Sequence, residues 1–368
     1  MSIIIFLIVL AVLILVHEFG HFIVAKKSGV RVDEFGLGFP PKLFGIKRGE
    51  TEYTVNAIPF GGFVKIFGEN PDEESLSGPD SARSFVNKPK WVQAAIIFAG
   101  VGFNFLLAWL LFSVGFMYGL PMSADIYPKG ATVTNERLLI ADVKKDSPAE
   151  GAGLKAGDMI LSLAVADKAE ALSVLDAEHV KEFITEREGK EIVFTYKRGQ
   201  EELTTNIIPK TGVVKDAPGI GIAMDSVGLV KLPLHRAFFE GGKMTVFMIY
   251  AVIVGFGALV TDAFKGTADF ANLAGPVGIV SLVGDATNLG FIYVLQFVAF
   301  ISINLGVLNL LPIPALDGGR LLFLLIESVK GSPVNYKIVN TIHAVGFIAL
   351  VLLMVFVTYN DIVRIIGS

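Results

Sequence analysis

Four long apolar runs place the strongest limit on how this chain can fold. They lie within residues 1–25, 94–120, 291–316 and 338–360. A helix needs about 20 predominantly apolar residues to cross a bilayer, and each run reaches that length. Charged residues make up 18% of the 368-residue chain, whereas soluble domains carry about 25%. The sequence therefore predicts an α-helical polytopic membrane protein with four transmembrane helices.

The first run has the position of a secretory signal but not its features. No basic stretch precedes the apolar residues, and no small-residue cleavage site precedes the polar cluster within the run. We therefore expect residues 1–25 to be retained as a transmembrane helix.

Basic residues near the ends of the spans predict the orientation. Lys and Arg are enriched in cytoplasmic loops. They are frequent in residues 26–93, whereas residues 262–290 contain only Lys265. Residues 26–93, which hold strand-like pieces and turn-forming glycines, would be a cytoplasmic, membrane-associated β-rich loop. Residues 131–223 have an ordinary charge content and would form an extracytoplasmic domain.

The first span carries a polar cluster, His17-Glu18-Phe19-Gly20-His21. On a helix His17 and His21 lie one turn apart on one face, where both imidazoles can reach a single Zn²⁺. Glu18 lies beside that face and can take a proton from a metal-bound water. The competing interpretation is a polar network that only packs helices together. Three ionisable side chains inside an apolar span are costly, which favours a functional role.

A catalytic zinc needs a third protein ligand and an open position for water. The chain has no cysteine, so the ligands must be histidine or carboxylate. Asp317 is the better candidate, because it follows the third span directly after Pro312 and Pro314 break the helix. Non-helical backbone at membrane depth is tolerated where it is buried or lines a cavity. The alternative is that Asp317 simply caps the following helix.

A shared zinc would restrict which segments cross the membrane. The two histidines lie near the inner end of the first span, and Asp317 emerges on the same side if the second and third predicted spans are the next crossings. A crossing by residues 244–261, a fifth and shorter apolar run, would place Asp317 at the opposite face. We therefore expect the segment 236–285 to be interfacial or re-entrant.

Three motifs stand in a recognisable order: HEFGH in the first span, PFGGFVKIFGE at residues 59–69 and NLLPIPALDGG at residues 309–319. In these motifs, and over essentially its whole length, the chain resembles the site-2 protease family. The resemblance is to the bacterial branch with a PDZ domain, the regulator-of-sigma-E protease type. The chain departs from the family pattern where Ala99-Gly100 is followed by Val101, while Asn104 stands where the family has an asparagine.

The resemblance implies one Zn²⁺ with a general base beside it. The zinc ligands would be His17, His21 and Asp317, and the base would be Glu18. The β-rich loop would lie against the membrane and pair with an unwound strand of the substrate, although plain surface hairpins are the alternative. The substrate-binding residues would be Asn309, Asn56, Gly61 and Gly62.

Residues 143–163 resemble the core of a PDZ domain, with a strand, a short helix and a Gly-Asp turn into a second strand. We expect residues 131–223 to form one inserted α+β PDZ domain. Residues 179–187 would be its second helix, and a strand at residues 219–222 could receive a peptide or a carboxylate. The domain would gate substrates by peptide capture or size exclusion, or it would be a rigid cover without a ligand.

The expected activity is hydrolysis of peptide bonds in the transmembrane segments of single-span membrane proteins. The family implies anti-sigma factors or signal-peptide remnants as substrates. It also implies the bacterial cytoplasmic (inner) membrane, with the active site toward the cytoplasm. The net charge of −4, with mixed signs along the loops, gives no indication of a nucleic-acid partner. The alternatives are an inactive membrane-bound PDZ scaffold and an ion-relaying transporter, which predicts internal repeats that the sequence lacks.

Overall fold

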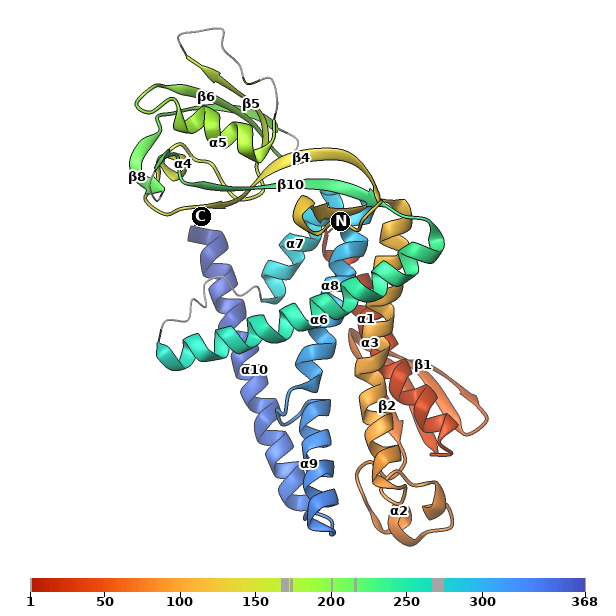
Figure 1. Cartoon of the computed structure of the whole chain (residues 1–368). Helices are drawn as coiled ribbons and strands as arrows, with labels where there is room; N and C mark the ends of the chain where they lie inside the picture. The colour runs from red at the N-terminus through yellow and green to blue at the C-terminus, as the bar shows by residue number, and fades with distance from the viewer. Residues whose placement is uncertain are drawn as a thin grey trace. The chain divides into compact units, whose positions relative to one another are not determined.

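The computed structural model describes residues 2–166, 172, 175–199, 201–214, 217–266 and 275–367. They form two compact units, one from Met1–Val114 with Phe238–Ser368 and the other from Gly115–Ala237. The first unit is mainly helical, and the second is built around a β-sheet (Figure 1). The residues predicted to bind zinc all belong to the helical unit.

Each of the four apolar runs predicted as spans lies mostly within a long helix of this unit, although the third helix ends at Leu310 and not at the predicted residue 316. Its elements are α1 (Ser2–Lys27), α2 (Glu73–Ser77), η1 (Ser81–Arg83), α3 (Lys90–Tyr118), α6 (Leu234–Lys265), α7 (Pro276–Leu289), α8 (Phe291–Leu310), α9 (Asp317–Lys330) and α10 (Tyr336–Gly367). Among the described residues, five helices are long and apolar enough to cross a membrane, namely α1, α3, α6, α8 and α10. These properties fit a polytopic membrane protein and make α6 a fifth candidate span.

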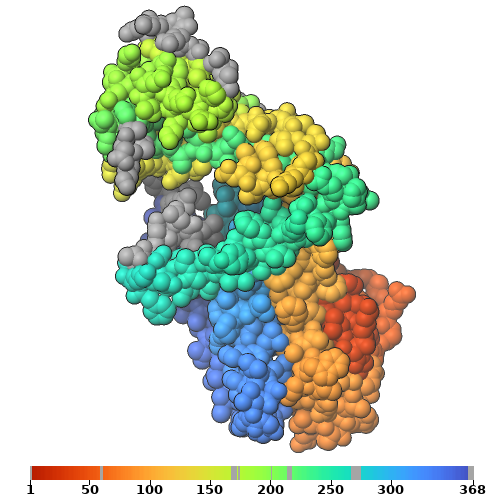
Figure 2. Space-filling model, in the orientation of Figure 1, coloured from red at the N-terminus to blue at the C-terminus, as the bar shows by residue number. Residues whose placement is uncertain are grey.

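Helix α6 is longer than the apolar run within it. The run covers residues 244–261, but the helix spans 32 residues, because the polar residues that flank the run are also compatible with a helix. Near its start α6 packs on α3, where the indole Nε1 of Trp109 donates a 2.7 Å hydrogen bond to the carbonyl of Phe238. Figures 1 and 2 show α6 crossing the bundle at a steep angle, and Figure 1 shows that α3, α8 and α10 run in roughly the same direction.

The chain leaves helical geometry between α8 and α9. Helix α8 ends at Leu310, and α9 begins with Asp317. Pro312 and Pro314 explain the interruption, since proline lacks the backbone N–H and its ring clashes with the preceding turn. Ala315 has a φ of 79°, in the left-handed region that non-glycine residues rarely adopt. The connection is therefore a non-helical loop with a defined conformation, and this loop positions Asp317 at the start of α9.

The β-rich loop is a hairpin of two long strands. They are β1 (Val32–Arg48) and β2 (Thr51–Ile66). Residues 32–37 pair on one side with residues 62–66, and part of the same segment pairs on its other side with residues 52–55. The hairpin thus bends back on itself, and among the described strands residues 62–66 form an outer edge of the sheet. Aromatic packing joins it to α1, with the ring centroids of Phe22 and Phe35 5.3 Å apart.

The inserted unit has a six-stranded sheet in the order β3-β10-β4-β5-β6-β7. Its elements are β3 (Leu120–Ser123), η2 (Ala124–Ile126), β4 (Thr132–Val143), α4 (Pro148–Gly151), β5 (Met159–Val165), α5 (Ala177–Thr185), β6 (Ile192–Arg198), β7 (Glu201–Ile207), β8 (Lys210–Val214), β9 (Ala217–Gly219) and β10 (Ile222–Lys231). Its core joins Leu163 and Phe194 of the sheet to Val180 of α5. The unit extends beyond residues 131–223, because β3 pairs with the end of β10.

Candidate metal centre

His17 and His21 lie one turn apart on the buried face of α1, with 7% and 9% of their surfaces exposed. Their Nε2 atoms are 3.2 Å apart. This approach follows from the helical repeat of 3.6 residues, which brings side chains at i and i+4 to the same face. The two imidazoles therefore present one nitrogen each to a common point.

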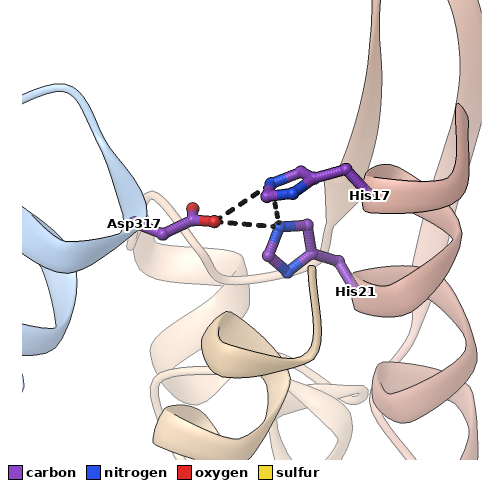
Figure 3. A group of neighbouring side chains, drawn as sticks. All are labelled: His17, His21 and Asp317. Carbon is purple, nitrogen blue, oxygen red and sulfur yellow. Dashed lines mark hydrogen bonds and ion pairs between the residues drawn. The ribbon is translucent and has the colours of Figure 1, made fainter. Parts of the chain in front are cut away.

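Asp317 reaches the same point from the beginning of α9. Its Oδ2 lies 3.1 Å from Nε2 of His17 and 3.3 Å from Nε2 of His21 (Figure 3). The three ligand atoms lie within 4.8 Å of one another, and the described residues contain no second group of this kind. Among the described residues, no side chain forms a capping hydrogen bond at the start of α9. Asp317 thus faces the histidines and does not cap its own helix.

Helix α3 provides a partner for Nδ1 of each imidazole, here called the outer nitrogen. Nδ1 of His21 lies 2.8 Å from the carbonyl oxygen of Ile96, and Nδ1 of His17 lies 3.1 Å from the side-chain amide of Asn104. A histidine that binds metal through Nε2 carries its proton on Nδ1 and donates it to an acceptor. The Ile96 carbonyl is such an acceptor. A side-chain amide can be turned by 180° with almost no change in shape, so Asn104 can present its oxygen to His17.

Two glycines allow α1 and α3 to approach closely enough for these contacts. A Cβ on Gly20 of α1 would lie 2.4 Å from the carbonyl oxygen of Ala99. A Cβ on Gly100 of α3 would lie 2.4 Å from Nε2 of His21 and 2.8 Å from Cε1 of His17. Small residues at helix contacts are typical of membrane proteins, because they let backbones come together. The space for the centre is therefore made by α3 as well as by α1.

A cavity of about 320 Å³ opens beside the three ligands, and Glu18 lines it. On the hairpin side its wall includes Phe63 and Val64 of β2. A Cβ on the neighbouring Gly62 would lie 3.4 Å from Cγ of Glu18. The edge of the sheet and the predicted base thus meet at one cavity. A peptide lying along the edge would pass beside Glu18.

A second cavity of about 370 Å³ adjoins the first. Both cavities are lined by Glu69 and Arg320, which form an ion pair. The second cavity is also lined by His343 of α10 and by Gln93 at the start of α3. The ion pair of Glu69 and Arg320 therefore lies between the ligand cavity and a second space lined by residues of α3, α9 and α10.

The remaining predicted residues take different places. Asn309 is half-buried in the last turn of α8 and is not among the described residues that line the ligand cavity. Asn56 is buried within the hairpin, where its amide donates a 3.1 Å hydrogen bond to the carbonyl of Gly38. Gly61 has a φ of 110° and lies against the ring of Phe39. Asn56 and Gly61 therefore shape the hairpin, whereas Gly62 lies next to the centre.

Sequence reasoning missed Gly100 and the contact that Asn104 makes. Ala99-Gly100 entered the sequence analysis only as the pair that precedes the departure at Val101, yet a pair of small residues in a long apolar helix is a signal for close helix packing. The bond between Asn104 and His17 joins residues 87 positions apart. The sequence gives no indication of that pairing.

The donor set fits zinc. Two imidazole nitrogens and one carboxylate oxygen, with room for water at a fourth position, are typical of catalytic zinc sites. The outer nitrogens of both imidazoles have partners, which orients the rings as in known histidine–zinc sites. Since the chain has no cysteine, thiolate-rich metal centres are excluded.

Comparison with known proteins identifies the family. Residues 5–353 match the description of peptidase family M50, the site-2 protease family. A provisionally named zinc metalloprotease from Nostoc sp. is 36% identical over 98% of this chain and 96% of its own length. A second one, from Clostridium acetobutylicum, is 35% identical over 98% of this chain and 97% of its own. The regulator of sigma-W protease RasP from Bacillus subtilis is 30% identical over 99% of this chain and 98% of its own.

One solved structure is similar to a smaller part of the chain. It is the PDZ domain of an SdrC-like protein from Listeria monocytogenes, with 26% identity, a TM-score of 0.21 and coverage of 25% of this chain and 92% of that one. The family, in contrast, is established by full-length similarity, and it confirms the resemblance found in the motifs. This chain belongs to peptidase family M50 and is an intramembrane zinc metalloprotease.

Proposed function

We propose that this chain holds a single zinc on His17, His21 and Asp317 and uses Glu18 as the general base for peptide-bond hydrolysis. The observation that carries the proposal is the meeting of the three ligand groups beside Glu18, at a cavity within a bundle of apolar helices. Bound zinc would polarise the carbonyl that is attacked and lower the pKa of its water.

The position of Glu18 suits proton transfer. It follows His17 directly in the sequence and lines the cavity that the ligands face. Its carboxylate takes a proton from the attacking water and passes it to the nitrogen of the leaving amine. Glu18 therefore serves both halves of the reaction without leaving the cavity wall.

The sheet edge supports a binding mode for the substrate. Residues 62–66 are an outer edge, and an extended peptide can add to such an edge through backbone hydrogen bonds. A transmembrane helix must unwind locally before its amide can be attacked. Pairing with this edge would hold the unwound segment beside Glu18, with Gly62 at the closest point and Asn56 and Gly61 maintaining the shape of the hairpin. Asn309 would contribute to positioning the same peptide.

The geometry of the centre supports four crossings. Helix α3 leads away from the end of α1 that bears the histidines, and α8 returns to it, since Asp317 lies 3.1 Å from His17. The chain between α3 and α8 must therefore begin and end on the same side of the bilayer. This requirement is met if α6 lies at the interface or enters and leaves the same face, and its steep angle to α3, α8 and α10 is consistent with that placement (Figure 1).

The substrates are proposed to be single-span membrane proteins. The relative from Bacillus subtilis is named the regulator of sigma-W protease, so an anti-sigma factor is one candidate substrate, and a signal-peptide remnant is another. We place the chain in a bacterial cytoplasmic membrane with its zinc toward the cytoplasm, because Lys and Arg gather in residues 26–93.

The inserted unit is proposed to be a PDZ domain on the outer side that controls access of substrates. Residues 219–222 connect β9 to β10, and the carbonyl of Gly221 accepts a 2.8 Å hydrogen bond from the amide of Lys144. A domain of this size next to the membrane could act by capturing a peptide or by excluding large extracytoplasmic domains.

The test is to measure zinc content and cleavage of a model transmembrane substrate with the purified full-length chain. Replacing Glu18→Gln keeps the shape of the side chain and removes the base, so zinc should be retained while the cleavage rate falls by about 100-fold or more. Replacing Asp317→Ala should reduce both zinc content and cleavage. If the wild-type chain retains zinc but cleaves none of several substrates, the inactive PDZ scaffold becomes the better description.

A further inference from the structure

The loop that delivers Asp317 is held in an unfavourable backbone conformation. Residues 311–316 contain two prolines, and Ala315 has a φ of 79°, which favours glycine. Such a conformation persists when neighbouring groups determine it. Helix α10 supplies neighbouring groups that contact this loop.

Two positions on one face of α10 contact this loop. Nδ1 of His343 accepts a 2.8 Å hydrogen bond from the backbone amide of Ala315. One turn further on, a Cβ on Gly346 would lie 2.6 Å from the carbonyl oxygen of Pro314. Gly346 lets the backbone of α10 approach the loop, and His343 supplies the acceptor for the amide that precedes Asp317 by two residues.

The hydrogen bond also fixes the proton on the imidazole. A backbone amide can only donate, so Nδ1 of His343 is unprotonated and the proton of the neutral ring lies on Nε2. Nε2 is buried and has no hydrogen-bond partner among the described residues, and His343 lines the second cavity. The two ring nitrogens therefore have separate roles, one toward the loop and one toward the cavity.

We propose that His343 is a positioning residue for the zinc centre, acting through its Nδ1 on the amide of Ala315. The inference rests on the proposed role of Asp317 as a zinc ligand. Without this acceptor the amide of Ala315 would be left unpaired at membrane depth, where unpaired backbone groups are strongly disfavoured. The loop would then relax to a conformation that satisfies Ala315 and moves Asp317 away from His17 and His21.

Packing alone does not account for this arrangement. The ring of His343 does pack on Phe323, with centroids 5.5 Å apart. A leucine could fill that space equally well, but it could not accept a hydrogen bond. A packing role and a positioning role for His343 therefore differ in whether the hydrogen-bond acceptor at Nδ1 matters. A substitution can remove this acceptor and still fill the space of the ring.

Asparagine and glutamine separate the two ring nitrogens. The amide group of asparagine occupies the position of Nδ1, whereas that of glutamine reaches the position of Nε2. We expect His343→Asn to keep the zinc affinity within about threefold of the wild type. His343→Gln and His343→Leu should weaken it by about tenfold or more, the range seen when outer-shell partners of metal ligands are removed. Zinc affinity is measured on the full-length chain in detergent by competition with a chelator.

A matched control comes from the same helix. Within the described part of the chain, the hydroxyl of Thr341 bonds only to the carbonyl of Lys337 in its own helix, so Thr341→Val should leave zinc affinity unchanged. Gly346→Ala disturbs the same loop from its second contact and should also weaken zinc binding. It provides an independent test if His343→Leu does not fold.

The possible outcomes distinguish this inference from the proposed ligand set. If Asp317→Ala leaves zinc affinity unchanged, Asp317 is not a ligand and the proposed ligand set is wrong. If Asp317→Ala abolishes zinc binding but His343→Asn and His343→Gln behave alike, the positioning role is wrong and the ligand set stands. If His343→Gln keeps the affinity while His343→Asn loses it, the ring acts through Nε2, which also overturns the inference.

Discussion

At the level of single residues, the centre depends on two residues outside the proposed ligand set. Gly100 makes room for both imidazoles, and Asn104 lies at the outer nitrogen of His17. Asn104 is fully buried, and its own backbone carbonyl accepts a 2.8 Å hydrogen bond from the hydroxyl of Ser302 on α8. The contacts around His17 therefore connect α1, α3 and α8. A change in the packing of these helices would shift the proposed ligands.

A methyl group at position 100 should prevent zinc binding. In Gly100→Ala the added Cβ would lie 2.4 Å from Nε2 of His21 and 2.8 Å from Cε1 of His17, so the rings or the helices must move. We expect loss of bound zinc from the purified chain, measured by metal analysis. Gly102→Ala is the control, since the nearest atom to its Cβ would be Cε1 of Phe98 at 3.8 Å. Equal zinc content in both variants would contradict the close packing described.

At the level of elements, ion pairs hold the hairpin against the end of α1. Lys26, in the last turn of α1, forms a 2.5 Å ion pair with Glu50 in the turn between β1 and β2. Arg83 approaches the same carboxylate at 2.7 Å. The hydrogen bond from Lys26 lowers the pKa of Glu50 below its ordinary value, with a further contribution from Arg83. These contacts hold the hairpin relative to α1 and hence the sheet edge relative to Glu18.

A second contact between elements joins α10 to the beginning of α7. Asp361 of α10 is buried, and its carboxylate accepts hydrogen bonds from the amides of Gly275, at 3.2 Å, and Gly278, at 2.8 Å. It therefore caps α7 from another helix, in the role that an N-cap side chain usually fills. Pro276 at the first helical position needs no such partner, because it has no amide hydrogen.

Removal of this cap should destabilise the helical unit. We expect Asp361→Ala to lower the free energy of unfolding by about 0.5–2 kcal/mol, the usual range for losing an N-cap. The measurement is thermal unfolding in detergent. Thr358→Val is the matched change on α10, since that hydroxyl bonds to the carbonyl of Met354 in its own helix. Equal destabilisation by the two variants would show that Asp361 is not acting as a cap.

At the level of the whole molecule, the number of membrane crossings can be tested by labelling introduced cysteines. The chain has no cysteine, so single cysteines report on single positions. Lys47, Lys129 and Lys265 are all exposed. Four crossings predict that Lys129→Cys and Lys265→Cys react with a membrane-impermeant thiol reagent applied from outside. Lys47→Cys should react only after permeabilisation. If Lys265→Cys shares the behaviour of Lys47→Cys, α6 crosses the membrane and the interfacial assignment is wrong.

The grouping of His17, His21 and Asp317 was predictable because these residues belong to short patterns with a chemical reason. The i, i+4 spacing of His17 and His21 and the proline break before Asp317 are both visible in the sequence. The bent sheet was not predictable in detail, because residues 32–37 use both edges and the second pairing depends on how the hairpin folds back. The apolar run at residues 244–261 is shorter than α6, because a search for apolar residues does not detect the polar residues at the two ends of the helix.

The two glycines between α1 and α3 have a consequence for how a substrate can enter. Gly20 and Gly100 bring these helices together over the ligands, and Ile96 and Asn104 tie α3 to both imidazoles. None of the three proposed ligands lies on α3, but separating α1 from α3 would remove the partners of both Nδ1 atoms, so we expect these two helices to stay together during turnover. A lateral doorway for a transmembrane substrate therefore belongs on another side of α1, and the moving parts of the enzyme should be sought there.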